Sequence, residues 1–252
     1  MSQEKRIELI KQLLEERQEL STKDIMQEFG ISQDTARRDI VLLAKRGEVR
    51  RTHGGILPLD FGRSVPNFQS RLARFTKQKT QIALAAATYF KPHHVYFVDS
   101  STILLKTCQN INMPLTIVTH SLDNCMALAE HNKVRVKVLS GTLNHENRYF
   151  YSNLAIEELQ NVVFDTAFIA ASGIDENGAY LLDQDDAQIV GMAVKRARKV
   201  ILVAEHQKFI NKSYYRICPL DKISLFITDQ APTPEQRAMF APETKIIVTQ
   251  ED

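Results

Sequence analysis

The stretch Gly30–Gly55, GISQDTARRDIVLLAKRGEVRRTHGG, decides the fold of the N-terminal part of this chain. Gly30 allows a tight turn, because glycine tolerates a positive φ. Ser32 is suited to capping a helix, and Ile40 and Leu43 would give that helix one apolar face. The pattern therefore predicts a turn followed by a short helix that begins directly after Ser32.

The first two turns of this helix carry polar and basic side chains that suit contact with DNA. In a helix-turn-helix, the N-terminal turns of the second helix enter the major groove. There arginine can form bidentate contacts with guanine, and glutamine with adenine. The candidates on the helix and its cap are Ser32, Gln33, Thr35, Arg37 and Arg38. The alternative is that Arg37 and Arg38 only solvate a surface helix.

A small basic β-hairpin, or wing, is expected beyond this helix. The run Glu48–Ile56 carries Arg50, Arg51 and His53 before a Gly-Gly pair. The stretch 32–55 holds six Lys/Arg against three Asp/Glu, so a charge of +3 lies in one element of a chain whose net charge is +2. Such a local basic patch suits DNA phosphates, whereas the small net charge argues against a general polyanion binder.

This arrangement resembles the DeoR family of bacterial repressors. The N-terminal domain of that family is a winged helix-turn-helix with an arginine-arginine-aspartate signature and a following histidine-glycine-glycine. The signatures stand here at Arg37–Asp39 and His53–Gly55. The resemblance combines residue types, spacing and position near the N-terminus, and it implies binding to double-stranded operator DNA.

The chain is long for one domain, and its pattern divides it into three segments. Its 252 residues are interpreted as a winged helix-turn-helix over 1–57, a linker over 58–76 and a larger α/β domain over 77–252. In the first segment, helical spacing predicts a helix over 5–16 and a second one that ends at Gly30.

Two prolines and a glycine interrupt any regular pattern in the linker. Its segment 68–74 either begins the next domain or lies across the two domains. The basic residues Arg63, Arg71 and Arg74 are interpreted as solvated linker side chains, with contact to DNA as the alternative.

Beyond the linker, apolar runs alternate with helical patterns. Helices are expected over 77–90, 102–109, 121–130, 152–161, 186–198 and 234–240. Strands are expected over 95–98, 115–118, 134–139, 164–170, 200–203, 225–227 and 246–248. This alternation predicts an α/β domain with a mostly parallel sheet, in which ligands bind where loops leave the carboxyl ends of the strands.

The loop after the first strand of this sheet is a candidate anion site. Asp99 ends the strand, and Ser100, Ser101 and Thr102 precede a helix whose free N–H groups and dipole favour negative charge. The alternative is that Ser101 or Thr102 only caps the helix. The DeoR family resembles sugar-phosphate isomerases in its C-terminal domain, where an aspartate-serine-glycine-threonine-threonine loop is associated with a phosphorylated sugar effector. In this chain Ser101 replaces the glycine and Ile103 the final threonine.

Further matches to the family run through almost the whole remainder of the chain. His120 replaces an asparagine that follows a strand in the family, and Lys208 is the cation expected to contact the ligand. Val190 stands where the family commonly has lysine, so one expected cation is absent. A structural role for His120, and an ordinary surface position for Lys208, are the alternatives. The complete set of candidate effector-binding residues is Asp99, Ser100, Ser101, Thr102, His120, Ser121, Gly173 and Lys208.

Two function classes follow from these observations. The leading hypothesis is a transcriptional regulator, a repressor of a carbohydrate or nucleoside utilisation operon that a phosphorylated sugar or related anionic metabolite releases from DNA. The alternative is a sugar-phosphate isomerase or hydrolase fused to an autoregulatory DNA-binding domain, with Asp99, Asp165, Asp183 and Glu205 as acid–base groups. The sequence shows no histidine-acid-nucleophile set, phosphate-loop lysine motif or metal-ligand cluster, so catalysis, a cofactor and a bound metal are not expected.

The remaining expectations concern assembly and compartment. A homo-oligomer is expected, because one winged helix buries too little DNA surface for a typical operator affinity and symmetric half-sites double it. No apolar run approaches the ~18 residues that suggest a membrane span, so no membrane partner is expected. The three cysteines lie far apart and are interpreted as reduced, mostly buried thiols of a cytoplasmic protein.

Overall fold

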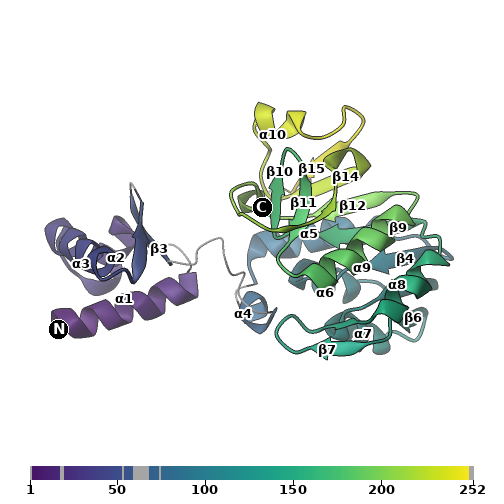
Figure 1. Ribbon diagram of the computed structural model, residues 1–252, viewed down its shortest axis with the longest axis horizontal. Coiled ribbons are helices and arrows are strands. Elements are labelled where there is room, and N and C mark those ends of the chain that lie inside the picture. The colour runs from purple at the N-terminus through teal and green to yellow at the C-terminus, as the bar shows by residue number, and fades with distance from the viewer. Residues whose placement is uncertain (1, 18–19, 53, 59–67, 74, 250–252) are drawn as a thin grey trace. The chain divides into compact units, whose positions relative to one another are not determined.

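The computed structural model describes residues 2–17, 20–52, 54–58, 68–73 and 75–249 (Figure 1). The chain divides into two compact units, Met1–Ser64 and Val65–Asp252. Throughout the described residues, no helix has both the length and the apolar character needed to cross a membrane.

The first unit consists of three helices and a small three-stranded sheet. Its elements are α1 (Gln3–Arg17), β1 (Leu20–Ser21), α2 (Thr22–Phe29), α3 (Gln33–Lys45), β2 (Val49–Arg51) and β3 (Gly55–Pro58). The antiparallel sheet has the strand order β1-β3-β2, so that β2 and β3 form the predicted hairpin. Helices followed by a wing are the architecture that the sequence predicts.

Local chemistry fixes the turn between α2 and α3. α2 begins at a capping box, in which the side chains of Ser21 and Asp24 each accept a hydrogen bond from the other's backbone N–H. It ends at Gly30, whose φ of 60° lies in the left-handed region. α3 then begins after Ser32, whose hydroxyl accepts a hydrogen bond from the amide of Thr35. The turn and the helix start predicted from the sequence are confirmed.

The core of this unit joins helices and wing. Ile10 of α1, Leu43 of α3 and Ile56 of β3 have no exposed surface. A Cβ at Gly55 would collide with the carbonyl oxygen of Leu20. The close pairing of β1 with β3 therefore requires glycine at this position, because any side chain would push the two strands apart.

The second unit is built on a seven-stranded parallel sheet. Its strands are β4 (Val95–Val98), β5 (Leu115–Thr119), β6 (Val134–Val138), β9 (Thr166–Ala170), β12 (Val200–Val203), β14 (Leu225–Thr228) and β15 (Lys245–Val248). The order is β15-β14-β12-β9-β4-β5-β6, and every pairing between neighbours is parallel. All seven predicted strands are present, and the predicted α/β class is confirmed.

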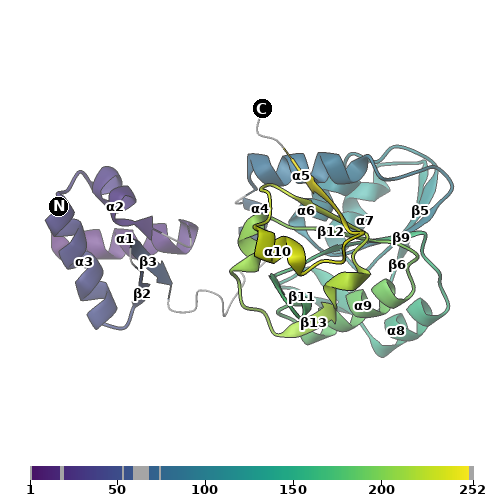
Figure 2. The same cartoon turned by 90° about the horizontal axis from the view of Figure 1, so that it is seen from above.

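Helices cover both faces of this sheet (Figure 2). One face carries α5 (Lys77–Ala87), α6 (Thr102–Cys108) and α7 (Leu122–Ala129); the other carries α8 (Asn153–Gln160) and α9 (Gln184–Lys195). Along β4, the side chains of Tyr96 and Val98 pack in the core beneath α5, α6 and α7, whereas Phe97 packs in the core beneath α8 and α9. Because successive side chains of a strand point to opposite faces, a strand covered on both sides is apolar throughout.

Several short elements around the sheet were not predicted from the sequence. They are α4 (Phe68–Ala73), the hairpin strands β7 (Thr142–Asn144) and β8 (Tyr149–Tyr151), the antiparallel strands β10 (Gly173–Asp175), β11 (Gly178–Leu181) and β13 (Tyr215–Cys218), and the 3-10 helices η1 (His206–Phe209) and η2 (Leu220–Lys222). Segments of three to six residues are too short to show a period. The predicted last helix is present as α10 (Pro234–Ala238).

The sheet order reverses direction beside β4. From β4 the chain proceeds through β5 to β6 at one edge, and it then returns to the other side of β4 with β9 and continues outward to β15. Such a switch point leaves a crevice at the carboxyl ends of the two strands that flank it, here β4 and β9. The loops after Val98 and Ala170 are therefore expected to bound a ligand site.

All three cysteines are free thiols. Cys108 and Cys218 are buried, and Cys125 is partly exposed. Burial raises the pKa of the Cys218 thiol to about 12, so that it stays protonated at neutral pH. The expectation of mostly buried, unpaired thiols is confirmed.

Candidate functional site

α3 presents most of its polar side chains to solvent and packs its apolar side chains toward the core. Gln33, Arg37 and Arg38 are exposed, whereas Ala36 and Leu43 are fully buried. The helix thus offers two cations and one amide on the side that a helix-turn-helix docks into the major groove.

The aspartate of the arginine-arginine-aspartate signature has a different role from its neighbours. Asp39 is fully buried and accepts hydrogen bonds from Arg6 Nε at 2.6 Å and from Gln3 Nε2 at 2.9 Å. The hydrogen bond to Asp39 raises the pKa of Arg6. A buried ion pair therefore joins α1 to α3 and fixes the direction in which α3 presents Arg37 and Arg38.

The remaining candidates for DNA contact lie on the helix cap and the wing. The hydroxyls of Ser32 and Thr35 are 3.0 Å apart and hold the first turn of α3. Arg51 is exposed on β2. Arg50 belongs to the same strand, and His53 lies outside the described residues.

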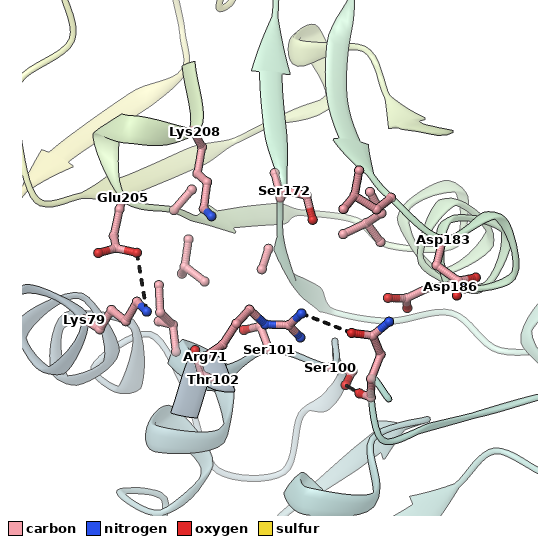
Figure 3. A pocket seen from close by; sticks show the side chains of 18 residues that line it. Arg71, Lys79, Ser100, Ser101, Thr102, Ser172, Asp183, Asp186, Glu205 and Lys208 are labelled. Atoms are coloured by element: carbon pink, nitrogen blue, oxygen red, sulfur yellow. Dashed lines mark hydrogen bonds and ion pairs between the residues drawn. The ribbon is translucent and has the colours of Figure 1, made fainter. Parts of the chain in front are cut away.

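In the second unit, a pocket opens at the carboxyl ends of β4, β9 and β12 (Figure 3). The loops Ser100–Ile103, Ala170–Ser172 and Val203–Glu205 line it, one from each strand. Residues Leu181–Asp183 and Asp186 line the side next to α9. The pocket lies where the switch point of the sheet predicts.

Among the described residues, three cations reach the pocket from different elements. Arg71 comes from α4, Lys79 from α5 and Lys208 from η1. The Nζ atom of Lys79 lies 3.7 Å from Oε2 of Glu205. Burial lowers the pKa of Lys208 to about 8, although the charge of Glu205 opposes this shift. A cation that has lost its hydration gains from an anionic ligand, so this side of the pocket suits a negatively charged group.

The start of α6 faces the same space. Ser101 caps the helix, because its hydroxyl accepts a hydrogen bond from the amide of Leu104 at 3.0 Å. Ser100 Oγ donates to the carbonyl of Asn147 at 3.4 Å. The capping role considered for Ser101 is thus confirmed, and its side chain nevertheless lines the pocket.

Carboxylates line the side of the pocket next to α9 (Figure 3). Oδ1 of Asp183 caps α9 by accepting hydrogen bonds from the amides of Asp185 at 3.0 Å and Asp186 at 3.4 Å. Its Oδ2 accepts from Asn144 Nδ2 at 3.3 Å. Ionised carboxylates only accept hydrogen bonds, so this side suits the hydroxyl groups of a ligand and repels a second anion.

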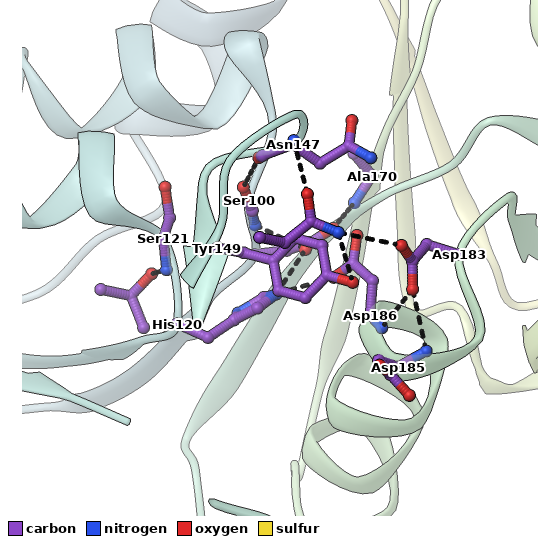
Figure 4. A network of polar contacts seen from close by, with 12 residues as sticks. Ser100, His120, Ser121, Asn147, Tyr149, Ala170, Asp183, Asp185 and Asp186 are labelled. Carbon is purple, nitrogen blue, oxygen red and sulfur yellow. Dashed lines mark hydrogen bonds and ion pairs between the residues drawn. The ribbon is translucent and has the colours of Figure 1, made fainter. Parts of the chain in front are cut away.

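A buried network lies behind the acidic side (Figure 4). His120 Nε2 lies 2.7 Å from Oδ1 of Asp186 and 3.7 Å from Oδ1 of Asp99. The Asp99 carboxylate also accepts hydrogen bonds from the amides of Ser100 and Ala170. Burial raises the pKa of Asp99, and the charge of Asp186 raises it further. The network holds the start of α9 against the ends of β4 and β5.

The same three groups are close enough to share a metal ion. One ligand atom from each of Asp99, His120 and Asp186 lies within 4.8 Å of the others. Sequence spacing did not reveal this grouping, because the residues follow three different parts of the fold. These ligand atoms take part in hydrogen bonds: His120 Nε2 is bonded to Asp186, and the Asp99 carboxylate accepts from two backbone amides. The structure shows these three side chains as a hydrogen-bonded cluster.

Half of the predicted effector residues line the pocket. They are Ser100, Ser101, Thr102 and Lys208. Asp99 and His120 lie behind its wall in the network described above. The structural role considered for His120 is therefore the one that its position supports.

Ser121 and Gly173 are also absent from the lining. The hydroxyl of Ser121 accepts a hydrogen bond from the amide of Asn124 at 3.2 Å and caps α7. A Cβ at Gly173 would lie 2.5 Å from the carbonyl oxygen of Asn211, so glycine is needed there for backbone packing.

Arg71, Lys79 and Asn147 are pocket residues that the sequence analysis did not assign to the effector site. The interpretation of Arg71 as a solvated linker side chain is wrong, because its Nη1 donates to Asn147 Oδ1 at 3.1 Å inside the pocket. Burial lowers the pKa of Arg71. The available signal was Phe68, an aromatic residue three positions earlier that packs in the core without exposed surface. Val190, the position that lacks the family's lysine, is itself buried in the core.

One unit carries a helix and a wing suited to docking on DNA, and a separate unit holds a cation-lined pocket. Together these features define a ligand-responsive transcriptional regulator. Residues 6–60 match the family described as the DeoR-like helix-turn-helix domain. Residues 74–230 match the DeoR C terminal sensor domain. The chain therefore belongs to the DeoR family.

Relatives in this family span nearly the whole chain. The HTH-type transcriptional repressor GlcR of Bacillus subtilis (strain 168) is 29% identical over 92% of this chain and 90% of its own length. The putative aga operon transcriptional repressor of Escherichia coli O157:H7 is 28% identical over 89% of this chain and 86% of its own length. Among solved structures, ribose 5-phosphate isomerase A from Methanocaldococcus jannaschii aligns over 52% of each chain, with a TM-score of 0.37 and 13% identity.

Proposed function

We propose that this protein represses a carbohydrate-utilisation operon and is released from its operator by a sugar monophosphate. Two relatives of nearly equal length are named as repressors, and one of them as that of the aga operon. The observation that carries the choice of ligand is a pocket with cations on one side and carboxylates on another.

The cationic side fits one phosphate group. Lys79 and Lys208 face Glu205, so two positive charges are opposed by one negative charge in this part of the lining. A phosphate monoester adds about two negative charges and three strong acceptor oxygens. Charge-assisted hydrogen bonds to such oxygens are roughly twice as strong as neutral ones.

The acidic side argues against a second phosphate. Asp183 and Asp186 line the pocket next to α9, and Asp183 already accepts hydrogen bonds from Asn144 and two backbone amides. Sugar hydroxyls can donate to these carboxylates, whereas a second phosphate would be repelled by them. A monophosphate with an uncharged polyhydroxyl part is therefore the ligand that matches both sides.

The DNA-binding part of the proposal rests on exposure and position. Gln33, Arg37 and Arg38 would read bases from the start of α3, and Arg50, Arg51 and His53 would contact phosphates from the wing. Ser32 and Thr35 would bring the first-turn amides of α3 to a backbone phosphate.

Repression also calls for a homo-oligomer. One winged helix covers a small DNA surface, and two copies on symmetric half-sites give a typical operator affinity. Light scattering on the full chain, with and without DNA, tests this part. A mass near that of one chain, 28.7 kDa, under both conditions would contradict it.

A ligand panel tests the proposed effector. An operator is first selected from random DNA with the full chain, and release is then followed by fluorescence anisotropy during titration with hexose 6-phosphates, pentose 5-phosphates, fructose 1,6-bisphosphate and the unphosphorylated sugars. We expect one monophosphate to release the DNA at concentrations at least tenfold below those of the bisphosphate and the free sugar. Equal potency of a free sugar would refute the phosphate requirement.

The proposal assigns no catalytic step to the chain. Asp99 and Asp165, two acids considered for catalysis, both accept hydrogen bonds from backbone amides. Incubation of the protein with the same sugar phosphates is expected to leave them unchanged by NMR. Turnover would instead favour the isomerase or hydrolase alternative.

A further inference from the structure

α4 connects the pocket to the chain that leads to the DNA-binding unit. It is the first described element of the second unit, and in sequence only residues 59–67 separate it from β3. Phe68, its first residue, has no exposed surface, and the Phe68 amide donates to the carbonyl of Glu146 at 2.9 Å. α4 is thus docked on the loop between β7 and β8.

Arg71 extends from α4 into the pocket (Figure 3). Its guanidinium carbon lies 5.5 Å from the centre of the Phe68 ring, and its Nη1 donates to Asn147 Oδ1 at 3.1 Å. Lys79 and Lys208 belong to other elements, α5 and η1. Among the cations that line the described part of the pocket, Arg71 is the one carried by α4.

Asn147 links this contact to the rest of the pocket wall. Its amide donates to Asn144 Oδ1 at 3.0 Å, and its carbonyl accepts from Ser100 Oγ at 3.4 Å. Asn144 in turn donates to Asp183. One chain of hydrogen bonds therefore runs from α4 along the pocket wall to the start of α9, so a movement of Arg71 would displace the residues of this chain.

An anionic ligand changes the balance of forces on Arg71. A guanidinium presents its N–H donors as a planar fork that matches the oxygens of a phosphate. Burial already disfavours its charge, so a phosphate placed beside it supplies a charge-assisted bond that water does not. A ligand shifts an equilibrium only if it binds two states with different affinity, and a contact made by α4 provides such a difference.

We infer that Arg71 binds the anionic group of the effector and that this bond fixes α4, so that α4 transmits the occupancy of the pocket to the DNA-binding unit. The inference rests on the proposed function, because it needs an anionic effector that releases DNA. It distinguishes Arg71 from Lys208, which would contribute to affinity without transmitting the signal.

The test separates the concentration of ligand that is needed from the release that is reached at saturation. Full-length wild type, Arg71→Ala, Arg71→Lys, Lys208→Ala and the exposed control Arg135→Ala are titrated with the strongest releasing monophosphate of the panel above, while operator affinity is measured. For each variant, operator affinity at saturating ligand is divided by that variant's own affinity without ligand. Hydrogen exchange of the α4 amides is followed in parallel, with inorganic phosphate as a second probe.

For Lys208→Ala we expect a release midpoint at least tenfold higher and the same ratio at saturation as wild type. For Arg71→Ala we expect saturating ligand to reduce operator affinity by a factor at least fivefold smaller than in wild type. Arg71→Lys should give an intermediate reduction. Ligand should slow exchange of the α4 amides in wild type and in Lys208→Ala, but not in Arg71→Ala. Arg135→Ala should behave as wild type.

A wild-type ratio at saturation in Arg71→Ala would overturn the inference and leave the proposed function standing. Failure of every monophosphate to release DNA from wild type would overturn the proposed function itself, and the inference with it. If thermal melting shows that Arg71→Ala does not fold, Arg71→Lys and Asn147→Ala take its place. Ratios equal to wild type in both of these variants would overturn the inference.

Discussion

The cations of the two units face different surroundings. Arg37 and Arg38 are exposed on α3, whereas burial lowers the pKa of both Arg71 and Lys208 in the pocket. Exposed cations bind a polyanion by releasing its counterions, so their contribution depends steeply on salt. Desolvated cations are less screened by salt, and the lowered pKa of Lys208, about 8, makes its charge depend on pH near neutrality. DNA binding and ligand sensing should therefore respond to different solution conditions.

The largest effect should follow from breaking the ion pair that orients α3. In Asp39→Ala the buried Arg6 loses its partner, which should cost the first unit about 3–5 kcal/mol of unfolding free energy. Calorimetry should show a lower melting temperature for one transition and no change in that of the second unit. In the matched control Glu4→Ala, an exposed pair with Arg46 is lost, and about 0–1 kcal/mol is expected. Equal costs in both variants would contradict the structural role of Asp39.

Removing a pocket cation should weaken ligand binding and spare DNA binding. Lys208→Ala should lose about 1.5–3 kcal/mol of effector affinity, because a charge-assisted hydrogen bond is lost. Isothermal titration with the releasing monophosphate measures this loss. The exposed Lys212 supplies a control of the same residue type. An unchanged affinity in Lys208→Ala would place the sensor site elsewhere.

Truncating the exposed arginines of α3 should reduce specificity. Arg37→Ala and Arg38→Ala should each cost about 1–3 kcal/mol of operator affinity if they read bases. Anisotropy titrations with operator and with random DNA of equal length distinguish this role. Equal losses on both DNAs would mean that these side chains only contact phosphates.

Effector affinity should fall as the pH rises above neutrality. The pKa of Lys208 is lowered to about 8, so its ammonium is mostly present at pH 7 and mostly lost at pH 9. If the charged form binds the phosphate, affinity should weaken about tenfold between these values, or about 1.4 kcal/mol. Lys208→Ala should lack this dependence. A wild-type affinity that is constant from pH 7 to pH 9 would contradict the pocket assignment.

The smallest effect is expected at the wing. Arg51→Ala should weaken operator and random DNA alike and reduce the salt dependence of binding by about one unit of slope. Titrations over a series of salt concentrations measure that slope. If only the operator lost affinity, Arg51 would be a base contact instead.

The regular elements of both units were predictable because these segments are long enough for their hydrophobic pattern to be recognised. Ser32 and Gly30 identify the turn before α3, and the apolar runs of the parallel sheet are bounded by helical patterns. Within the pocket, Ser100 and Lys208 were found because they lie in the loops after β4 and β12, where loops of parallel sheets converge, and because both loops resemble those of the DeoR family.

The remaining site residues were not predictable because tertiary contacts place them. Arg71 precedes the first strand of the sheet, and Asn147 lies in a hairpin of three-residue strands, so neither follows a recognisable strand of the parallel sheet. Asp99 and His120 were chosen for their position in the loops, but hydrogen bonds turn them toward the core. Side-chain direction at the end of a strand is set by neighbours that are remote in sequence.

The double use of Asp183 has a consequence for how this protein can evolve. One of its oxygens caps α9, and the same residue lines the pocket. Loss of a helix cap typically costs about 0.5–2 kcal/mol, so a substitution that altered sugar preference here would also loosen the helix. Ser172 lines the same pocket without capping a helix. Selection of variants for a new sugar should therefore recover changes at Ser172 more readily than at Asp183.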